Sequence, residues 1–285
     1  MPLDFRYHLV SLVAVFCALL IGILLGISLV GDPDLEKQVS GYLTLLQQQR
    51  GEIDQLQTLG RAYQTFGREV LPGLIRNKLA GRRIALIVTH RFQSRAPIVE
   101  QMGPLLVAAG ARVTSTTTVL PGFLHFTAEE AAPLLEELGY PMPVDRNVRS
   151  LLAAKMAVHV ANGKPELVQR LRSRRLIDVS GDYETPADAV VLVGGQPEAD
   201  PAAVEAVELP MIRALQEEGV PAVGCEPANV PVSCMEYYQP RHLPTVDNAD
   251  TVPGQLALVL ALAGQEGNYG IKPTADHLLP PRSQW

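Results

Sequence analysis

An uninterrupted apolar run near the start of the chain constrains its fold more than any other feature. Residues 9–30, LVSLVAVFCALLIGILLGISLV, contain no charged side chain, and their only hydroxyl groups belong to Ser11 and Ser28. At about 1.5 Å per residue such a helix is roughly 33 Å long, enough to cross the hydrocarbon core of a bilayer. A helix of this length in a soluble protein normally has a polar face, which this run lacks. The run therefore predicts a transmembrane helix.

The residues that flank this run favour a cytoplasmic N-terminus. The α-amine and Arg6 precede it, whereas three acidic residues and a single lysine follow it within residues 32–37. Lys and Arg close to a span tend to stay on the cytoplasmic side. We therefore expect a single-pass protein of the cytoplasmic membrane with its C-terminal part outside. A cleaved signal peptide is the alternative, but its apolar core is usually roughly 7–15 residues long, and residues 27–31 make a poor cleavage site.

A heptad pattern follows the apolar run. In residues 33–74, apolar or tyrosine side chains recur at alternating spacings of three and four, and Gln, Glu, Arg and Asp dominate between them. This pattern is typical of a coiled coil. Gln49, Gly60 and Gly67 weaken the pattern, since a glycine inside a helix costs about 1 kcal/mol relative to alanine. Pro72, followed by a glycine, is expected to end or kink the helix.

A lone amphipathic helix of this kind needs a partner, because its apolar stripe would otherwise lie in water. A parallel homodimer is the economical solution, since the membrane helices already hold two copies parallel. Two glycines of the span have a GxxxG spacing, which lets helices approach closely, although glycine is also common in membrane helices. The alternative is that the stripe packs back onto its own C-terminal domain. The residues predicted at the dimer interface are Val39, Tyr42, Leu46, Ile53, Leu56, Tyr63, Gly22 and Gly26.

From residue 81 onward the chain alternates continuous apolar runs with amphipathic segments. Such runs indicate strands buried on both faces of a parallel sheet, so we predict an open three-layer α/β domain with a mostly parallel sheet. Thr127 and Glu130 have the spacing of a helix capping box. The predicted organisation is a cytoplasmic tail and transmembrane helix (1–31), a coiled-coil stalk (32–80) and an extracytoplasmic α/β domain (81–285). The expected strands are 84–90, 112–120, 188–195 and 220–225, and the expected helices are 97–110, 148–161, 165–174, 201–218 and 253–263.

Charge and motifs argue against nucleic-acid binding and catalysis. The net charge of −6 lies in the C-terminal part, whereas nucleic acid requires a basic face. The arginines of residues 170–175 are a local exception that we interpret as a solvated helix face, with a lipid or partner contact as the alternative. Neither GxSxG, HExxH nor CxxC occurs, and the six histidines are scattered, so we expect no enzymatic activity.

Ligands of open α/β sheets bind beyond the carboxyl ends of the strands. A paired glycine there can cradle a phosphate, but without a GxGxxG or P-loop pattern it is a weak signal for a nucleotide. A plain tight turn is the alternative. The candidates at these strand ends are Thr89, His90, Arg91, Gly194, Gly195 and Glu226.

Few soft ligands lie outside the predicted membrane helix. Copper(I) prefers thiolate and thioether ligands, and the sequence offers Cys225, Cys234 and Met235, with Met211 or His242 as further candidates. Burial of these residues as structural side chains, or a disulfide between the two cysteines, is the alternative. We expect modest or absent copper binding and no other cofactor.

Two segments carry a resemblance to a known family. The start of the chain, RYHLVSLVAVF (6–16), and a late segment, VDNADT…GQLALVLAL…NYG (246–270), are its most specific parts. With the Gln-rich helix and the GRRIALIV strand, they resemble the mycobacterial copper-transport protein B (MctB) family, in which the corynebacterial cell-envelope protein SteB looks like another member. The resemblance covers almost the full chain.

The resemblance implies copper efflux or homeostasis, in some accounts through an outer-membrane pore. SteB-like members instead imply a dimeric coiled-coil envelope protein that works with a cytoplasmic partner in cell division and wall remodelling. A single apolar helix cannot enclose a channel, so this sequence does not fit the idea of a pore. No set of copper ligands from the family can be assigned to this sequence residue by residue.

The leading hypothesis is therefore a membrane-anchored, homodimeric and non-enzymatic envelope adaptor with protein partners in the cytoplasm and envelope. A copper transport component is the alternative. An extracytoplasmic nucleotide- or small-molecule-binding domain rests only on fold analogy.

Overall fold

The computed structural model describes residues 5–29, 33–89, 97–143 and 147–281. It divides into two compact units, residues 1–63 and residues 64–285, and each is described by itself. The predicted site residues His90 and Arg91 lie outside the described residues.

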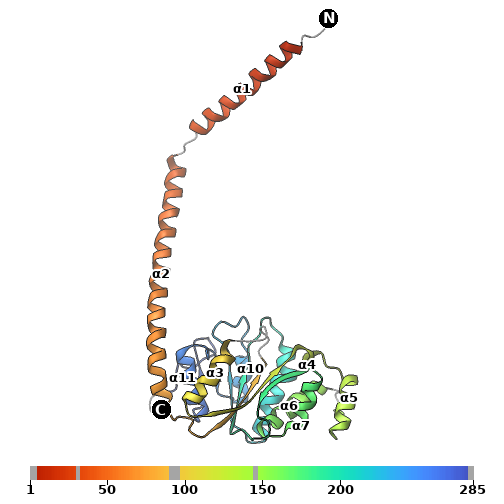
Figure 1. The fold of residues 1–285 in the computed structure, drawn as a ribbon. Helices are drawn as coiled ribbons and strands as arrows, with labels where there is room; N and C mark the ends of the chain where they lie inside the picture. Colours follow the sequence, from red (N-terminus) through yellow and green to blue (C-terminus); the bar gives the residue numbers. More distant parts are fainter. Residues whose placement is uncertain (1–4, 30–32, 90–96, 144–146, 282–285) are drawn as a thin grey trace. The chain divides into compact units, whose positions relative to one another are not determined.

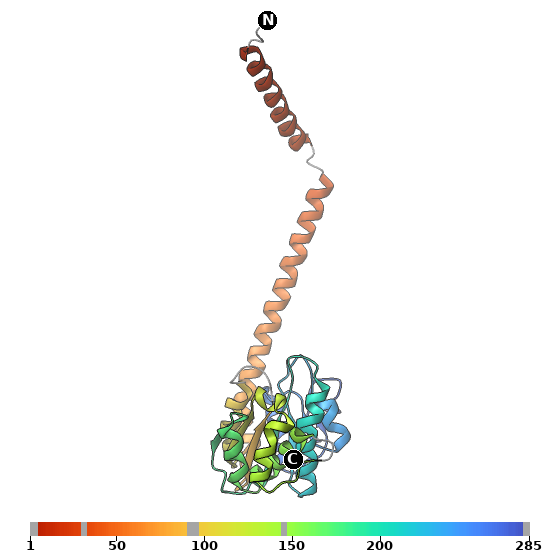
Figure 2. The same ribbon diagram turned by 90° about the vertical axis from the view of Figure 1, so that its right-hand side faces the viewer.

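Two long helices make up the N-terminal part of the chain. Helix α1 covers Phe5–Leu29, and helix α2 covers Pro33–Ile75. We expected Pro72 to end or kink α2, but the helix runs on to Ile75. Figure 2 draws α2 as one continuous helix. Proline removes only one backbone donor, and the buried side chains of Leu71 and Ile75 on either side of it anchor this last turn.

A seven-stranded sheet forms the centre of the second unit, in the order β3-β2-β1-β4-β5-β6-β7. All neighbouring strands pair in parallel except β2 and β3, which are antiparallel. The predicted mostly parallel sheet is therefore confirmed. The strands are β1 (Arg83–Val88), β2 (Arg112–Val119), β3 (Ile177–Gly181), β4 (Ala189–Val193), β5 (Ala222–Cys225), β6 (Thr245–Val246) and β7 (Asn268–Tyr269).

Helices connect the strands at bounds close to those predicted. The capping box at Thr127 is present, since its hydroxyl accepts from the Glu130 amide while the Glu130 carboxylate accepts from the Thr127 amide. The helices are α3 (Pro97–Ala108), α4 (Pro121–His125), α5 (Ala128–Glu137), α6 (Val148–Ala161), α7 (Pro165–Ser173), α8 (Pro201–Ala203), the π-helix η1 (Val204–Glu208), α9 (Leu209–Glu217), α10 (Met235–Tyr238), the 3₁₀ turn η2 (Gln239–Arg241) and α11 (Val252–Leu262).

Helices cover both faces of the sheet, which confirms the three-layer α/β architecture (Figure 1). Successive strand residues point to opposite faces, so Ile87 and Leu192 enter a core with α5, α6, α7, α9 and α10, which we call the first core. Leu86 and Val191 enter the second core, which contains side chains from α3, α11 and the end of α2. The central strands β1 and β4 are therefore almost entirely apolar, because both of their faces are covered.

Candidate functional site

Helix α1 has the length and composition of a membrane span. Residues His8–Gly26 form a candidate span, and none of it is buried inside the molecule. A core helix of a soluble protein would be mostly covered by protein, so this exposure suits a lipid environment. Gly22 and Gly26 lie on this helix, and an added Cβ at either would meet no other atom within 4 Å.

The predicted dimer interface on α2 is an exposed apolar stripe. Its described members, Tyr42, Leu46, Ile53, Leu56 and Tyr63, which we call the stalk seam, have relative exposures between 51% and 73%. The side chain of Val39 lies outside the described side chains, although the residue itself is in α2. Large apolar side chains exposed in such a row are unusual on a monomer.

The C-terminal end of α2 has buried apolar side chains, unlike the exposed stalk seam. Leu71 and Ile75 are buried in the second core. At Gly67, a Cβ would lie only 2.8 Å from Cγ1 of Val252, so the missing side chain allows α2 to approach the first residue of α11. The heptad pattern placed Gly67 in the interface between two stalk helices, but the structure places it against its own domain. The seam therefore ends before this residue.

The three predicted copper ligands do not come together. Cys225, at the end of β5, points into the second core, whereas Cys234 and Met235 lie in the first core on the other face of the sheet. Both thiols are free and buried. Burial raises the pKa of each thiol well above its usual range, and nearby carboxylates raise it further, which favours the thiol over the thiolate that binds a metal.

Further candidates for copper ligands are also separated. Met211 is buried in the first core with Cys234, whereas His242 is exposed. Among residues 5–29, 33–89, 97–143 and 147–281, no group of three His, Cys, Asp or Glu side chains is placed to hold a metal ion.

A buried ion pair lies at the carboxyl edge of the sheet. Glu226, which directly follows β5, is fully buried, and Oε1 of its carboxylate is 2.6 Å from Nζ of Lys272. The carboxylate also accepts hydrogen bonds from the Ser233 hydroxyl and the Cys234 amide. Lys272 donates a second hydrogen bond to the Pro227 carbonyl. These contacts compensate the cost of burying the charge of Glu226, and they link the loop that follows β5 to Lys272, 46 residues away in the sequence.

The late segment that carries the family resemblance folds around Asp247. The Asp247 carboxylate accepts from the backbone amides of Ile271 and Lys272, at 2.8 and 2.9 Å. Gly270 has a positive φ of 148°, and any Cβ there would overlap the Asp247 carboxylate. Glycine is therefore required at this position. The VDN and NYGIK motifs serve one structural purpose, which is to close the carboxyl ends of β6 and β7.

The paired glycines after β4 pack against a tyrosine instead of forming an open phosphate cradle. A Cβ on Gly194 would lie 2.6 Å from the Tyr238 hydroxyl, and the Gly195 amide donates to the Cys234 sulfur at 3.3 Å. The Tyr238 hydroxyl in turn donates to Glu208 at 2.6 Å. Glu208 is the last residue of the π-helix η1 and is buried. Sequence patterns gave no signal for this helix.

The arginines of residues 170–175 pair with an acidic side chain. Arg170 and Arg174 both contact the Glu137 carboxylate, at 2.7 and 3.6 Å. The interpretation as a solvated helix face is consistent with these exposed pairs, which contribute little to stability.

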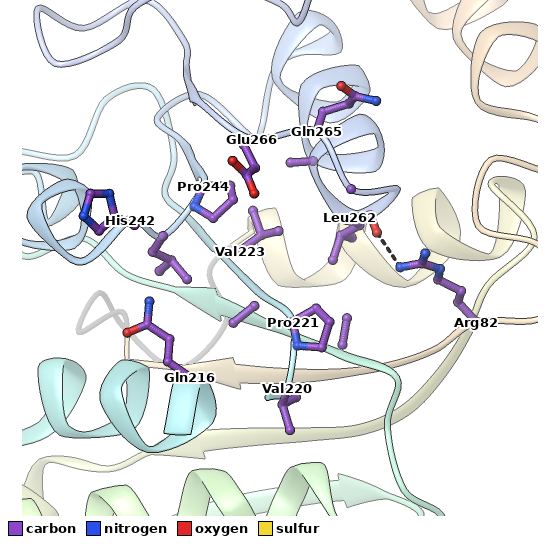
Figure 3. Close-up of a pocket in the computed structure, with 15 residues that line it drawn as sticks. Arg82, Gln216, Val220, Pro221, Val223, His242, Pro244, Leu262, Gln265 and Glu266 are labelled. Atoms are coloured by element: carbon purple, nitrogen blue, oxygen red, sulfur yellow. Dashed lines mark hydrogen bonds between the residues drawn. The ribbon is translucent and has the colours of Figure 1, made fainter. Parts of the chain in front are cut away.

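A cavity of about 350 Å³ opens at the opposite, amino edge of the sheet (Figure 3). The first residues of β4 and β5 line it, together with the C-terminal end of α11 and the turn that follows. Its floor is apolar, and the polar side chains around it are Arg82, Gln216, His242, Gln265 and Glu266. The sequence gave no signal for this cavity, because its lining comes from short segments far apart in the chain.

The comparisons with known proteins bear on nearly the whole chain. Residues 3–280 match the model of a protein family described as "Copper transport outer membrane protein, MctB". No curated protein matches the chain. The matched range includes α1, α2, the sheet and the late segment around Asp247, and the family together with the apolar helix fits a membrane-anchored, copper-transport-related envelope protein. The predicted resemblance is confirmed, and the chain belongs to the MctB family.

Proposed function

We propose that this protein is a single-pass, non-enzymatic envelope adaptor that acts as a homodimer through α2. In this proposal the N-terminus is cytoplasmic, α1 crosses the cytoplasmic membrane and the α/β domain lies outside it. The adaptor role concerns envelope or division processes, and the family description supports an association with copper homeostasis.

The observation that carries the proposal is the exposed stalk seam on a helix next to a membrane-length span. Each side chain from Tyr42 to Tyr63 in the seam is more than half exposed in a single copy. The seam has the spacing of a parallel coiled coil, and two copies anchored in one membrane already lie parallel. Pairing of two seams would remove this apolar surface from water, which is favourable by roughly 25 cal/mol per Å².

Sedimentation equilibrium of the full chain in detergent micelles tests the dimer. We expect the wild type to be dimeric and Leu46→Asp/Ile53→Asp to be monomeric, because two buried carboxylates per helix would face each other in the seam. Gln48→Asp/Gln55→Asp is the matched control, since it adds the same charges with the same spacing on the polar face. A monomeric wild type, or equal dissociation of both variants, would count against the adaptor.

Crosslinking in intact cells followed by identification of the captured proteins tests the adaptor role. We expect partners in both compartments, one crosslinked from the N-terminal tail and one from the α/β domain. Capture of the second chain copy alone would leave a dimer without an adaptor function and would contradict this part of the proposal.

A role as a copper transport component is the second candidate, and the family description favours it. The burial of the Cys225 and Cys234 thiols in different cores, on opposite faces of the sheet, argues against tight binding in the present conformation. Stoichiometric Cu(I) binding that is lost in Cys234→Ser would support transport. Rescue of a copper-sensitive deletion strain by the wild type but not by Cys225→Ser/Cys234→Ser would support it as well.

A further inference from the structure

The cavity at the amino edge of the sheet has the size of a small-molecule site. Its volume of about 350 Å³ is at the lower end of the range of roughly 300–1,000 Å³ for such pockets. The residues that line it come from the starts of β4 and β5, the loop before β6 and the segment after α11. All of them belong to the α/β domain, so the cavity is independent of the stalk seam.

The floor of the cavity is apolar. Val223, Leu243 and Leu262 line it and are each less than 5% exposed. Such a surface gains free energy when an apolar group displaces water from it. Pro244 and Val223 lie at the centre of the close-up, between the polar residues of the rim (Figure 3). The floor therefore favours a ligand with a small aliphatic group.

Arg82 supplies a positive charge at one side of the cavity. Its Nη1 donates to the Leu262 carbonyl at 2.8 Å, which fixes the guanidinium beside the end of α11 (Figure 3). A guanidinium has five N–H donors, and no ion pair of Arg82 occurs among the described residues. Arginine with spare donors is well suited to bind a carboxylate.

Glu266 supplies a negative charge over the same cavity. It lies in the turn between Gly264 and Gly267, whose positive φ values of 112° and 140° shape this segment. The Tyr269 hydroxyl donates to the Glu266 carbonyl at 2.6 Å, which holds the turn in place. In the described part of the chain the Glu266 carboxylate forms no ion pair with Arg82. Two opposite charges thus line one cavity without neutralising each other.

We propose that this cavity binds a zwitterionic α-amino acid with an aliphatic side chain. The ligand carboxylate contacts the Arg82 guanidinium, its ammonium group contacts the Glu266 carboxylate, and its side chain covers the floor formed by Val223, Leu243 and Leu262. An anion or a cation alone satisfies only one of the two charges, so the arrangement selects a ligand that carries both.

Calorimetric titration of the full chain in detergent micelles tests this site without altering the protein. L-Leucine is the probe, 4-methylpentanoate lacks its ammonium group, and 3-methylbutylamine lacks its carboxylate. We expect leucine to bind, and each analogue to bind roughly tenfold more weakly or worse, because each loses one charge-assisted contact. No heat with leucine at millimolar concentration, or equal affinity for the three compounds, would overturn the proposal.

Two variants test which charged group of leucine each cavity residue binds. Arg82→Gln should weaken leucine binding about tenfold and leave 3-methylbutylamine unaffected, whereas Glu266→Gln should weaken leucine and leave 4-methylpentanoate unaffected. Arg112→Gln and Glu198→Gln, both exposed and outside the cavity, are the matched controls. Leucine binding that is unchanged in both cavity variants would contradict the assigned site, and the wild-type titrations decide the proposal if a variant fails to fold.

Discussion

The same apolar residue types have opposite environments in the two parts of this molecule. Leu46 and Ile53 on α2 are about half exposed, whereas Leu192 in β4 and Ile87 in β1 are fully buried. Burial of a leucine or isoleucine side chain contributes about 1.5–3 kcal/mol, so the α/β domain gains its stability within one copy. The stalk seam gains nothing until a second surface covers it. The difference teaches that the apolar residues of the domain stabilise its fold, whereas those of the stalk seam are available for the assembly that we propose.

Glycines show the same contrast. A Cβ at Gly224 in β5 would overlap the Tyr238 ring, whereas a Cβ at Gly60 in α2 would meet nothing within 4 Å. Close packing therefore requires a glycine at position 224, whereas Gly60 only weakens the helix.

The largest effect is expected where the domain buries charge. Lys272→Met removes the partner of the fully buried Glu226 carboxylate, and breaking such a pair costs about 3–5 kcal/mol. Urea unfolding of the full chain in detergent, followed by near-ultraviolet circular dichroism of the tyrosines, measures this loss.

The double variant Glu226→Gln/Lys272→Met is the control for that loss. It removes both charges, so we expect it to recover part of the stability. A double variant no more stable than Lys272→Met would show that the lysine stabilises the domain by packing rather than by charge.

One substitution made in both regions should change stability in opposite directions. Gly224→Ala should destabilise the domain by about 1–3 kcal/mol, because the added methyl group overlaps Tyr238. Gly60→Ala should stabilise α2 by up to about 1 kcal/mol. Thermal unfolding followed at near- and far-ultraviolet wavelengths separates the two transitions, and the same sign for both variants would contradict the contrast.

Removing a helix cap should have a smaller effect on the domain. Thr127→Ala deletes the hydroxyl that accepts from the Glu130 amide, and the loss of such a cap costs about 1 kcal/mol. Thr127→Ser keeps the oxygen and is the matched control in the same urea titration. Equal loss in the two variants would show that the methyl group, not the hydroxyl, carries the effect.

The stability of the domain should depend on pH. The Arg83 guanidinium and backbone amide bind Asp188 and lower its pKa to about 2, from 3.8. Because the folded value is the lower one, this contribution is present above pH about 4 and is lost as the pH falls toward 2. Urea midpoints across this range should fall less in Asp188→Asn than in the wild type. Identical profiles would contradict the assignment.

Most of the fold could be predicted from local patterns. The apolar strand runs, the heptads and the capping box at Thr127 each specify an element within a few residues. The antiparallel strand β3 was missed because its IDVSG sequence is short and mostly exposed, and β6 and β7 because each has only two residues. Strands as short as these contain too few residues to show a periodic pattern of apolar side chains.

The sites could be predicted less well than the fold. Cys225 and Cys234 are nine positions apart, but the face to which each thiol points depends on the strand register and on the turn before α10. The contacts between Glu226 and Lys272, and between Tyr238 and Glu208, join residues that no local pattern links. The amino-edge cavity also depends on tertiary packing, since its lining comes from short segments far apart in the chain that come together only when the sheet forms.

Disulfide crosslinking across the stalk seam tests the central claim most directly. In a Cys17→Ser background of the full chain in its native membrane, Gln49→Cys places a thiol at a seam position, and Gln47→Cys places one on the polar face. Facing seam positions of a parallel coiled coil are close enough for a disulfide, whereas outward positions are not. We predict a covalent dimer for Gln49→Cys and a monomer for Gln47→Cys. No crosslink at Gln49→Cys, or equal crosslinking at both positions, would contradict the account.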